Sequence, residues 1–180
     1  MMTFCETRDT LSADYAFMEH LIVSAFPKEE RRSLDALRLY SRENMRFHPT
    51  VIKQDGRRIG LMNYWTLDGM AYVEHFATLP EVRGHGYGRM ALEEMKRRVG
   101  PMVLEVETPD SEMARRRIGF YERCGFCLCQ EPYLQPPYRK GDSWFPLLLM
   151  FHGFAPDNPP YREAKGEIYR HVYGMEMEEV

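Results

Sequence analysis

The chain has 180 residues, of which 44% are hydrophobic and 28% are charged. This balance is typical of a soluble domain, and the length suits one domain with a single core. A formal net charge of -3 gives no general attraction to nucleic acid or to a membrane surface. The longest apolar run, residues 145–151, is far shorter than the about 20 residues that cross a bilayer. The first residues lack the pattern of a signal peptide. We therefore expect a cytoplasmic protein with neither nucleic acid nor membrane as a partner.

Two helices are predicted in the first part of the chain, after a short strand at residues 3–7. Ser12 can cap the first helix, and Pro27 ends it. Ser33 can cap the second, shorter helix. The apolar face of the first helix is expected to comprise Tyr15, Met18, Ile22 and Ala25.

An antiparallel meander is predicted next. Strand-like runs at residues 47–53, 58–66 and 70–78 are separated by Asp55-Gly56 and by Asp68-Gly69. An Asp-Gly pair between two such runs is a strong signal for a hairpin. These three runs are therefore expected to pair with one another in order.

The second half alternates strands and helices. A helix with Leu92, Met95 and Val99 on one side is followed by further elements, at 102–107 (strand), 110–124 (helix), 126–130 (strand), 132–143 (loop) and 145–151 (strand). The whole order predicts an α/β (α+β) fold, with a mixed central sheet of about seven strands and helices on both faces. We expect residues 1–154 to form this domain and residues 155–180 to form a C-terminal tail with a helix beginning at Pro160.

A glycine-rich loop joins the meander to the following helix. Gly84, Gly86 and Gly88 alternate there, so backbone N–H groups can converge without obstruction by Cβ atoms. The helix adds the positive end of its dipole, and Arg83 and Arg89 can add charge-assisted contacts. The loop is therefore suited to a diphosphate. It is neither a Walker loop nor a G-x-G-x-x-G dinucleotide motif. A plain glycine turn is the remaining alternative.

Two motifs resemble those of the GNAT superfamily of N-acetyltransferases. The segment Arg83-Gly84-His85-Gly86-Tyr87-Gly88 matches the family's Gln/Arg-x-x-Gly-x-Gly/Ala motif, and Tyr121-Glu122-Arg123-Cys124-Gly125-Phe126 matches its Tyr-x-x-x-Gly-Phe run. The interval of 33 residues from Gly88 to Tyr121 is usual for the family. The order of elements also resembles the family throughout residues 1–151.

The resemblance implies acetyl-CoA as co-substrate, without a metal. In this family the cofactor lies in a cleft between two central strands that splay apart at the glycine loop. Backbone groups of Ala77 and Thr78 would pair with the pantetheine arm, much as an added strand would. The diphosphate would be held by Arg83, Gly84, His85, Gly86, Tyr87, Gly88 and Arg89. One departure is Ala114, which stands where many members carry an Asn that contacts the pantetheine.

The chemistry requires a base for the acceptor amine and an acid for the leaving thiolate, since an alkyl amine is mostly protonated near neutral pH. The family motif places Tyr121 next to the cofactor sulfur as the acid. Glu74, on the strand that leads to Thr78, is our candidate base. Glu105 and Glu107 are rival bases or binders of the amine.

The resemblance places the acceptor site at the first two helices and at residues 132–144. Aromatic residues there, such as Tyr138, could wall a pocket, and the acidic residues would suit a cationic amine. Arg139 or Lys140 could instead pair with a carboxylate or a phosphate. The sequence therefore predicts a small-molecule or peptide amine without naming it.

Three further interpretations stay open. The chain could be a GNAT-fold sensor that binds acyl-CoA without catalysis. The tail helix could be the functional part, docked on its own domain or on a second copy in a homodimer. The C-x-x-C-x-C cluster of Cys124, Cys127 and Cys129 could bind zinc, but it lacks a second ligand pair, and we favour reduced, partly buried thiols.

Overall fold

The structure is a computed structural model that describes residues 1–175. The chain forms two compact units. Unit 1 comprises residues 1–66 and 73–94, and unit 2 comprises residues 67–72 and the chain from Met95 onward. The chain passes between the units within β4 (Arg57–Leu67), β5 (Met70–Thr78) and α3 (Tyr87–Val99).

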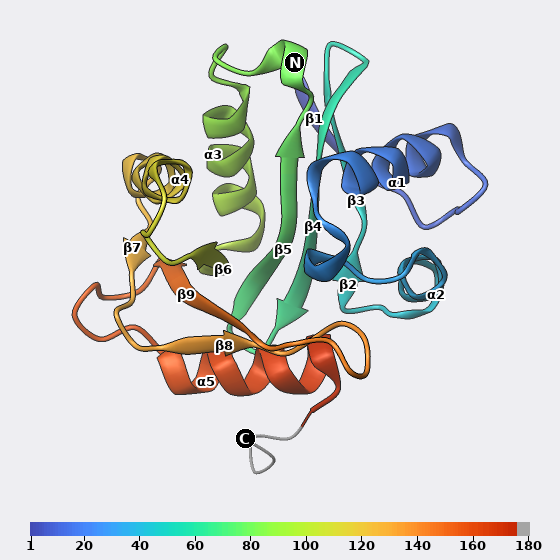
Figure 1. Ribbon diagram of the computed structural model, residues 1–180. Coiled ribbons are helices and arrows are strands. Elements are labelled where there is room, and N and C mark those ends of the chain that lie inside the picture. The colour runs from blue at the N-terminus through green and yellow to red at the C-terminus, as the bar shows by residue number, and fades with distance from the viewer. Residues whose placement is uncertain (176–180) are drawn as a thin grey trace. The chain divides into compact units, whose positions relative to one another are not determined.

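Unit 1 contains an antiparallel sheet (Figure 1). β3 (Thr50–Gln54) pairs with β1 (Met2–Glu6) on one side and with β4 on the other, and the short β2 (Phe47–His48) also pairs with β4. β3 and β4 meet at Asp55 and Gly56, with φ angles of 49° and 79°. Positive φ at both residues is the signature of the tight hairpin turn that Asp-Gly favours. The first predicted hairpin is therefore confirmed.

Two helices complete unit 1, with a short 3-10 turn, η1 (Lys28–Glu30), between them. α1 (Ala13–Ala25) begins where the Ser12 hydroxyl accepts from the Tyr15 N–H at 3.1 Å. α2 (Leu34–Glu43) begins in the same way at Ser33, which accepts from the Ala36 N–H at 3.2 Å. Both predicted caps are confirmed.

The predicted apolar face of α1 is correct except at its end. Tyr15, Met18 and Ile22 are buried, and Leu21 joins them. Ala25, however, is exposed. Ala25 is the last residue of the helix, and no further helical turn follows to bury it.

Unit 2 is built around β9 (Phe145–His152). Three strands pair antiparallel with it: β6 (Met102–Glu107), β7 (Cys127–Leu128) and β8 (Tyr133–Gln135). α4 (Glu112–Arg123) is capped by Ser111 and closes at Gly125, whose φ is 78°. The chain therefore has the mixed α/β architecture that the sequence predicts.

The prediction of a loop over residues 132–143 is wrong for its first part. Tyr133 pairs with Leu147 and Gln135 with Phe145, so β8 is a true edge strand. Leu134 faces Pro146, and a proline has no N–H to donate to the ladder. The strand is therefore short, and its sequence resembles that of a loop. The strand predicted at 126–130 is likewise only Cys127–Leu128.

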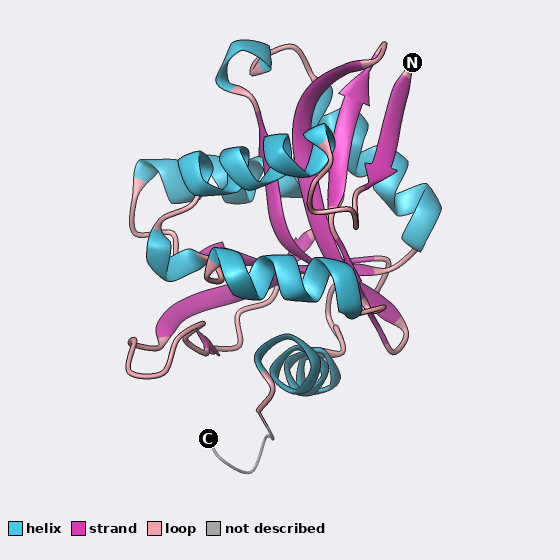
Figure 2. Cartoon of the chain, turned by 90° about the vertical axis from the view of Figure 1, so that its right-hand side faces the viewer, coloured by secondary structure: helices cyan, strands magenta, loops and turns pink. Residues whose placement is uncertain are grey.

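The last described segment is helical and belongs to unit 2. α5 (Tyr161–Glu167) starts directly after Pro160 and continues into a π-helical turn, η3 (Ile168–Tyr173). Ala164, Ile168, Tyr169 and Val172 are buried, and the segment lies along β8 and β9 (Figures 1 and 2). Among residues 1–175, no helix has the length and apolar character that a membrane crossing requires.

Candidate active site

The glycine loop of unit 1 is open and exposed. It follows the 3-10 turn η2 (Pro80–Val82) and leads into α3. Gly84 and Gly86 have φ angles of 79° and 80°, and a Cβ atom at either would meet nothing within 4 Å. The first bond of α3 runs from the Met90 N–H to the Gly86 carbonyl at 3.1 Å. The N–H groups that precede Met90 in this helix therefore have no intrahelical acceptor and can bind an anion.

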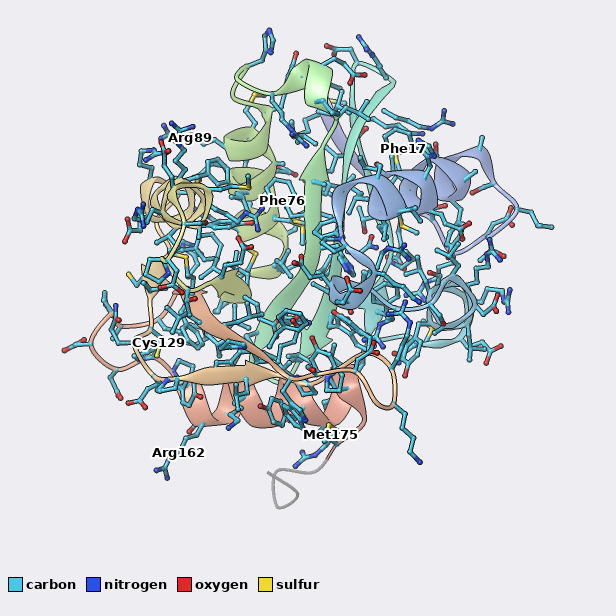
Figure 3. All side chains as sticks on the ribbon, in the orientation of Figure 1. Phe17, Phe76, Arg89, Cys129, Arg162 and Met175 are labelled. Carbon is cyan, nitrogen blue, oxygen red and sulfur yellow. The ribbon has the colours of Figure 1, made fainter. Side chains whose placement is uncertain are left out.

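Side chains of the loop add positive charge and fix its shape. The Nδ1 atom of His85 lies 3.0 Å from the Arg83 carbonyl, so His85 folds back on its own loop. Arg83 reaches the Thr78 carbonyl at 3.5 Å. Arg89 projects from the first turn of α3 (Figure 3). Residues 83–89 thus have the backbone geometry and the charge to hold a diphosphate.

The end of β5 approaches β4 unusually closely at Gly60. A Cβ atom at Gly60 would lie 2.5 Å from the Ala77 carbonyl oxygen and 3.1 Å from the Thr78 Cα. Carbonyl groups of a regular ladder lie in the plane of the sheet, whereas Cβ atoms stand out of it. The Ala77 carbonyl therefore leans over the space that Gly60 leaves empty. The next contact, from the Leu79 N–H to the Ile59 carbonyl at 2.9 Å, is an ordinary hydrogen bond.

Glu74 carries a buried ion pair in unit 1. Its side chain is 0% exposed, and its Oε1 lies 3.1 Å from the Nε of Arg32, whose side chain is 8% exposed. Trp65 donates its indole N–H to Oε2 at 2.8 Å. The guanidinium of Arg32 also lies over the rings of Tyr40 and Trp65, at 4.5 and 5.2 Å. Glu74 as a whole residue is nevertheless half-buried, so its exposed area belongs to the backbone of β5.

Tyr121 lies on α4 in unit 2, as its motif predicts. It is 9% exposed, and its ring packs edge-on against Phe120 and Phe126. Burial raises the pKa of Tyr121 to about 12. The phenol therefore stays neutral over the whole physiological range and can act as a hydrogen-bond donor.

The three residues expected to bind the acceptor also lie in unit 2, in different surroundings. Glu107 is half-exposed and pairs with Arg117 at 3.1 Å. Glu105 accepts a hydrogen bond from the Tyr133 hydroxyl at 2.5 Å. Tyr138 accepts one from the Tyr173 hydroxyl at 3.3 Å. Glu105 and Tyr138 thus belong to networks with side chains that the sequence did not single out.

The candidate residues fall into two groups. Glu74, Ala77, Thr78 and residues 83–89 lie in unit 1, while Tyr121, Glu105, Glu107 and Tyr138 lie in unit 2. Sequence reasoning missed Arg32 and Gly60 in unit 1 and several tyrosines in unit 2. A buried arginine has no local signal, and a single glycine in a strand only suggests a close backbone approach.

The cysteines form neither a disulfide nor a metal centre in the described residues. All four are free thiols; Cys124 and Cys129 are buried. Among residues 1–175 there is no group of three or more His, Cys, Asp and Glu side chains that could hold a metal ion.

Comparison with known proteins identifies the family. Residues 15–126 match the model of the acetyltransferase (GNAT) family. A solved structure from Bacteroides thetaiotaomicron, described as a candidate acetyltransferase of the GNAT family, is 42% identical and has a TM-score of 0.92. The match covers 97% of this chain and 99% of that one. The chain therefore belongs to the GNAT family of acetyltransferases. A search of curated proteins finds no match.

More distant structures share the fold. A GNAT acetyltransferase from Elizabethkingia anophelis with acetyl-CoA bound is 15% identical, with a TM-score of 0.57 and coverage of 85% of this chain and 98% of that one. Naa50 from Arabidopsis thaliana, in complex with the bisubstrate analogue CoA-Ac-MVNAL, is 16% identical, with a TM-score of 0.60 and coverage of 85% and 99%. At these identities the likeness concerns the fold alone.

Proposed function

We propose that this protein is an acetyl-CoA-dependent N-acetyltransferase, which moves an acetyl group to a primary amine of a small molecule or peptide by direct attack on the thioester. The observation that carries the proposal is the open glycine loop at the start of α3, in a chain of the GNAT family. The acetyl-CoA bound to the Elizabethkingia protein and the CoA–peptide analogue bound to Naa50 support it. We place the activity in the cytoplasm, which the four free thiols favour.

The cofactor would be held by backbone groups of unit 1. We assign the diphosphate to the N–H groups of residues 83–89, with charge from Arg83 and Arg89. We assign the pantetheine amides to Ala77 and Thr78, where β5 is only half-buried and its Ala77 carbonyl leans toward Gly60. No metal ion is needed for this chemistry.

The reaction forms an amide bond and breaks a thioester bond. The neutral amine nitrogen attacks the carbonyl carbon, the C–S bond breaks, and the nitrogen loses one proton while the sulfur gains one. We assign Tyr121 to the sulfur. A phenol with a pKa of about 12 is a weak acid toward a thiolate, whose own pKa is about 8.5. Tyr121 would therefore stabilise the thiolate by a hydrogen bond while the net proton comes from the nitrogen.

Glu74 remains our candidate for the base. Its carboxylate already pairs with Arg32 and accepts from Trp65, which suits a structural role as well. Of its rivals, Glu107 is engaged by Arg117, and Glu105 accepts a hydrogen bond from Tyr133.

The first experiment is calorimetric titration with acetyl-CoA, followed by thiol release over a panel of amines. Wild type is expected to bind at micromolar concentration and to acetylate at least one amine. Gly86→Glu should abolish binding, because a side chain and a negative charge would enter the loop. Gly56→Glu is the matched control, since Gly56 has a φ of 79° and equally open surroundings.

The outcomes separate the alternatives. Binding without turnover on any amine or peptide would favour the acyl-CoA sensor. Binding that survives Gly86→Glu would mean that the loop does not hold the diphosphate. Loss of binding in both glycine variants would point to strain rather than to the site.

A further inference from the structure

A carboxylate, an imidazole and a hydroxyl form one hydrogen-bonded chain in unit 1. Glu6 ends β1, His48 ends β2, and Thr66 is the last residue but one of β4. The Nδ1 atom of His48 lies 3.1 Å from Oε2 of Glu6, and its Nε2 atom lies 2.9 Å from Oγ1 of Thr66. These three residues are distinct from those that we assign to acetyl transfer.

The register of the sheet directs the imidazole toward the hydroxyl. His48 lies opposite Tyr64 in the pairing of β2 with β4. The side chains of Tyr64 and Thr66 share a face of β4, because residues two apart in a strand point the same way. The His48 ring stacks on the Tyr64 ring, with centroids 4.6 Å apart and planes at 11°. This stacking fixes the ring with one nitrogen beside Thr66, farther along the same face.

Arg8 holds the carboxylate in place. Its Nε atom donates to Glu6, and its Nη2 atom donates to the Phe47 carbonyl at 2.8 Å. A carboxylate beside Nδ1 favours the tautomer that carries its proton on Nδ1, so Nε2 is left as an acceptor. The Thr66 hydroxyl then donates its hydrogen bond to His48.

These contacts are those of an activated nucleophile. A base within about 2.6–3.2 Å of a hydroxyl can take its proton, provided that a third group orients the base. The hydroxyl is accessible, since Thr66 is exposed, and the His48 side chain is 19% exposed. Arg46 donates to the Thr66 carbonyl at 3.2 Å. A positive charge therefore lies next to the nucleophile, where it would stabilise an oxyanion.

We propose that Thr66 and His48 form a second reactive site, which transfers acyl groups from activated acyl esters to the Thr66 oxygen, with Glu6 as a positioning residue. This reaction goes beyond the acetyltransferase activity and needs neither acetyl-CoA nor an amine. Because Thr66 is exposed, the donor class is defined by its reactive acyl carbon rather than by the shape of its leaving group.

The same proton moves through both halves of the reaction. The Thr66 oxygen attacks the ester carbonyl carbon as His48 accepts the hydroxyl proton. The bond between the acyl carbon and the leaving oxygen breaks, and His48 returns the proton to that oxygen. The product is an acyl ester of Thr66. Water then attacks this ester, His48 takes a proton from the water and gives it to the Thr66 oxygen, and the free acid leaves.

The first test measures release of 4-nitrophenolate from 4-nitrophenyl acetate, without acetyl-CoA and after accessible thiols have been blocked with iodoacetamide. Thr66→Val removes the hydroxyl at an exposed position and should lower the protein-dependent rate by at least roughly 10-fold. Thr66→Ser keeps a hydroxyl and should retain most of the rate. Thr108→Val is the control and should leave the rate unchanged, because the Thr108 hydroxyl bonds to the Asp110 carboxylate instead of an imidazole.

A stable adduct locates the reactive oxygen. A fluorophosphonate forms a phosphonyl ester that water removes slowly, and mass spectrometry of the digested protein identifies the labelled residue. We expect the label on Thr66, and its rate of formation should fall at least roughly 10-fold in His48→Gln. A wild-type rate of 4-nitrophenolate release from Thr66→Val, together with label only on other residues, would overturn the proposal.

The tautomer of His48 tests the positioning role of Glu6. The NMR chemical shifts of the two ring nitrogens report which of them carries the proton in the neutral imidazole. Wild type should carry it on Nδ1, whereas Glu6→Gln should show a mixture of tautomers and slower labelling of Thr66. Equal labelling rates in the two proteins would remove Glu6 from the site. Acetyl-CoA is absent from every assay, so each result is independent of the acetyltransferase function.

Discussion

Burial of the Tyr121 phenol determines what this residue can contribute to acetyl transfer. With a pKa of about 12, full proton transfer to a thiolate would be uphill by roughly 5 kcal/mol. In the proposed mechanism, Tyr121 would instead donate a hydrogen bond to the sulfur in the transition state. We expect Tyr121→Phe to lower kcat by about 10- to 100-fold with little change in the Kd for acetyl-CoA. Single-turnover kinetics and calorimetry check this, and an unchanged kcat would remove Tyr121 from the mechanism.

Glu74 combines a proposed catalytic role with a structural one. Its ion pair with Arg32 is buried, and breaking one side of such a pair costs about 3–5 kcal/mol. Glu74→Gln should therefore lower the free energy of unfolding by about 3 kcal/mol, measured by denaturant unfolding. If Glu74 is also the base, kcat at a temperature where both proteins are folded should fall by at least roughly 100-fold. Destabilisation with an unchanged kcat would assign Glu74 to Arg32 alone.

At the scale of elements, the contact between β4 and β5 at Gly60 leaves no space for a side chain. Gly60→Ala would place a methyl group 2.5 Å from the Ala77 carbonyl, so the β5 backbone must move. We expect the Kd for acetyl-CoA to rise by at least roughly 10-fold, and stability to fall by about 1–3 kcal/mol. Gly119→Ala is the control, because its nearest neighbour is only the flexible end of Arg123, at 3.2 Å. Equal affinities in both variants would contradict the role of Ala77 and Thr78.

Elements with local chemical signals were predictable from the sequence. Ser12 and Ser33 cap the helices that follow them, and Asp55-Gly56 makes the expected turn. β8 was not predictable, since its strand character comes from pairing with β9 rather than from its own residues. The candidate site likewise contains residues with a local sequence signal and residues without one. Glycine and tyrosine motifs indicated the residues that we propose for the cofactor and the acid, but the networks of Arg32 and Tyr173 depend on tertiary contacts.

At the scale of the whole molecule, buried phenols couple stability to alkaline pH. Burial is the first cause that raises the pKa of each of Tyr15, Tyr72, Tyr121, Tyr133 and Tyr169. In the unfolded chain these groups ionise near pH 10, whereas in the native state they remain neutral to higher pH. The unfolded state then binds fewer protons, so stability falls as pH rises above about 10.

The expected loss of folding stability is appreciable even for a single tyrosine. Tyr121 alone accounts for roughly 2.7 kcal/mol between pH 10 and its native pKa of about 12. Denaturant unfolding at pH 8, 9, 10 and 11 measures the free energy of unfolding. The contribution of the phenols to it should be constant up to pH 9, and the free energy should fall steeply beyond pH 10. Absorbance of phenolate at 295 nm should rise together with unfolding. Full ionisation of all tyrosines in a protein that stays folded would contradict this account.

The π-helical turn at Ile168–Tyr173 has a consequence for how this chain tolerates changes in length. A π-turn holds more residues than an α-turn, so the place of Tyr173 beside Tyr138 is set by residue count. Loss of one residue between Ile168 and Val172 would keep the segment helical but rotate Tyr173 by about 100° about the helix axis. A point substitution there would change one side chain, whereas a single-codon deletion would break the hydrogen bond between Tyr173 and Tyr138 without replacing either residue.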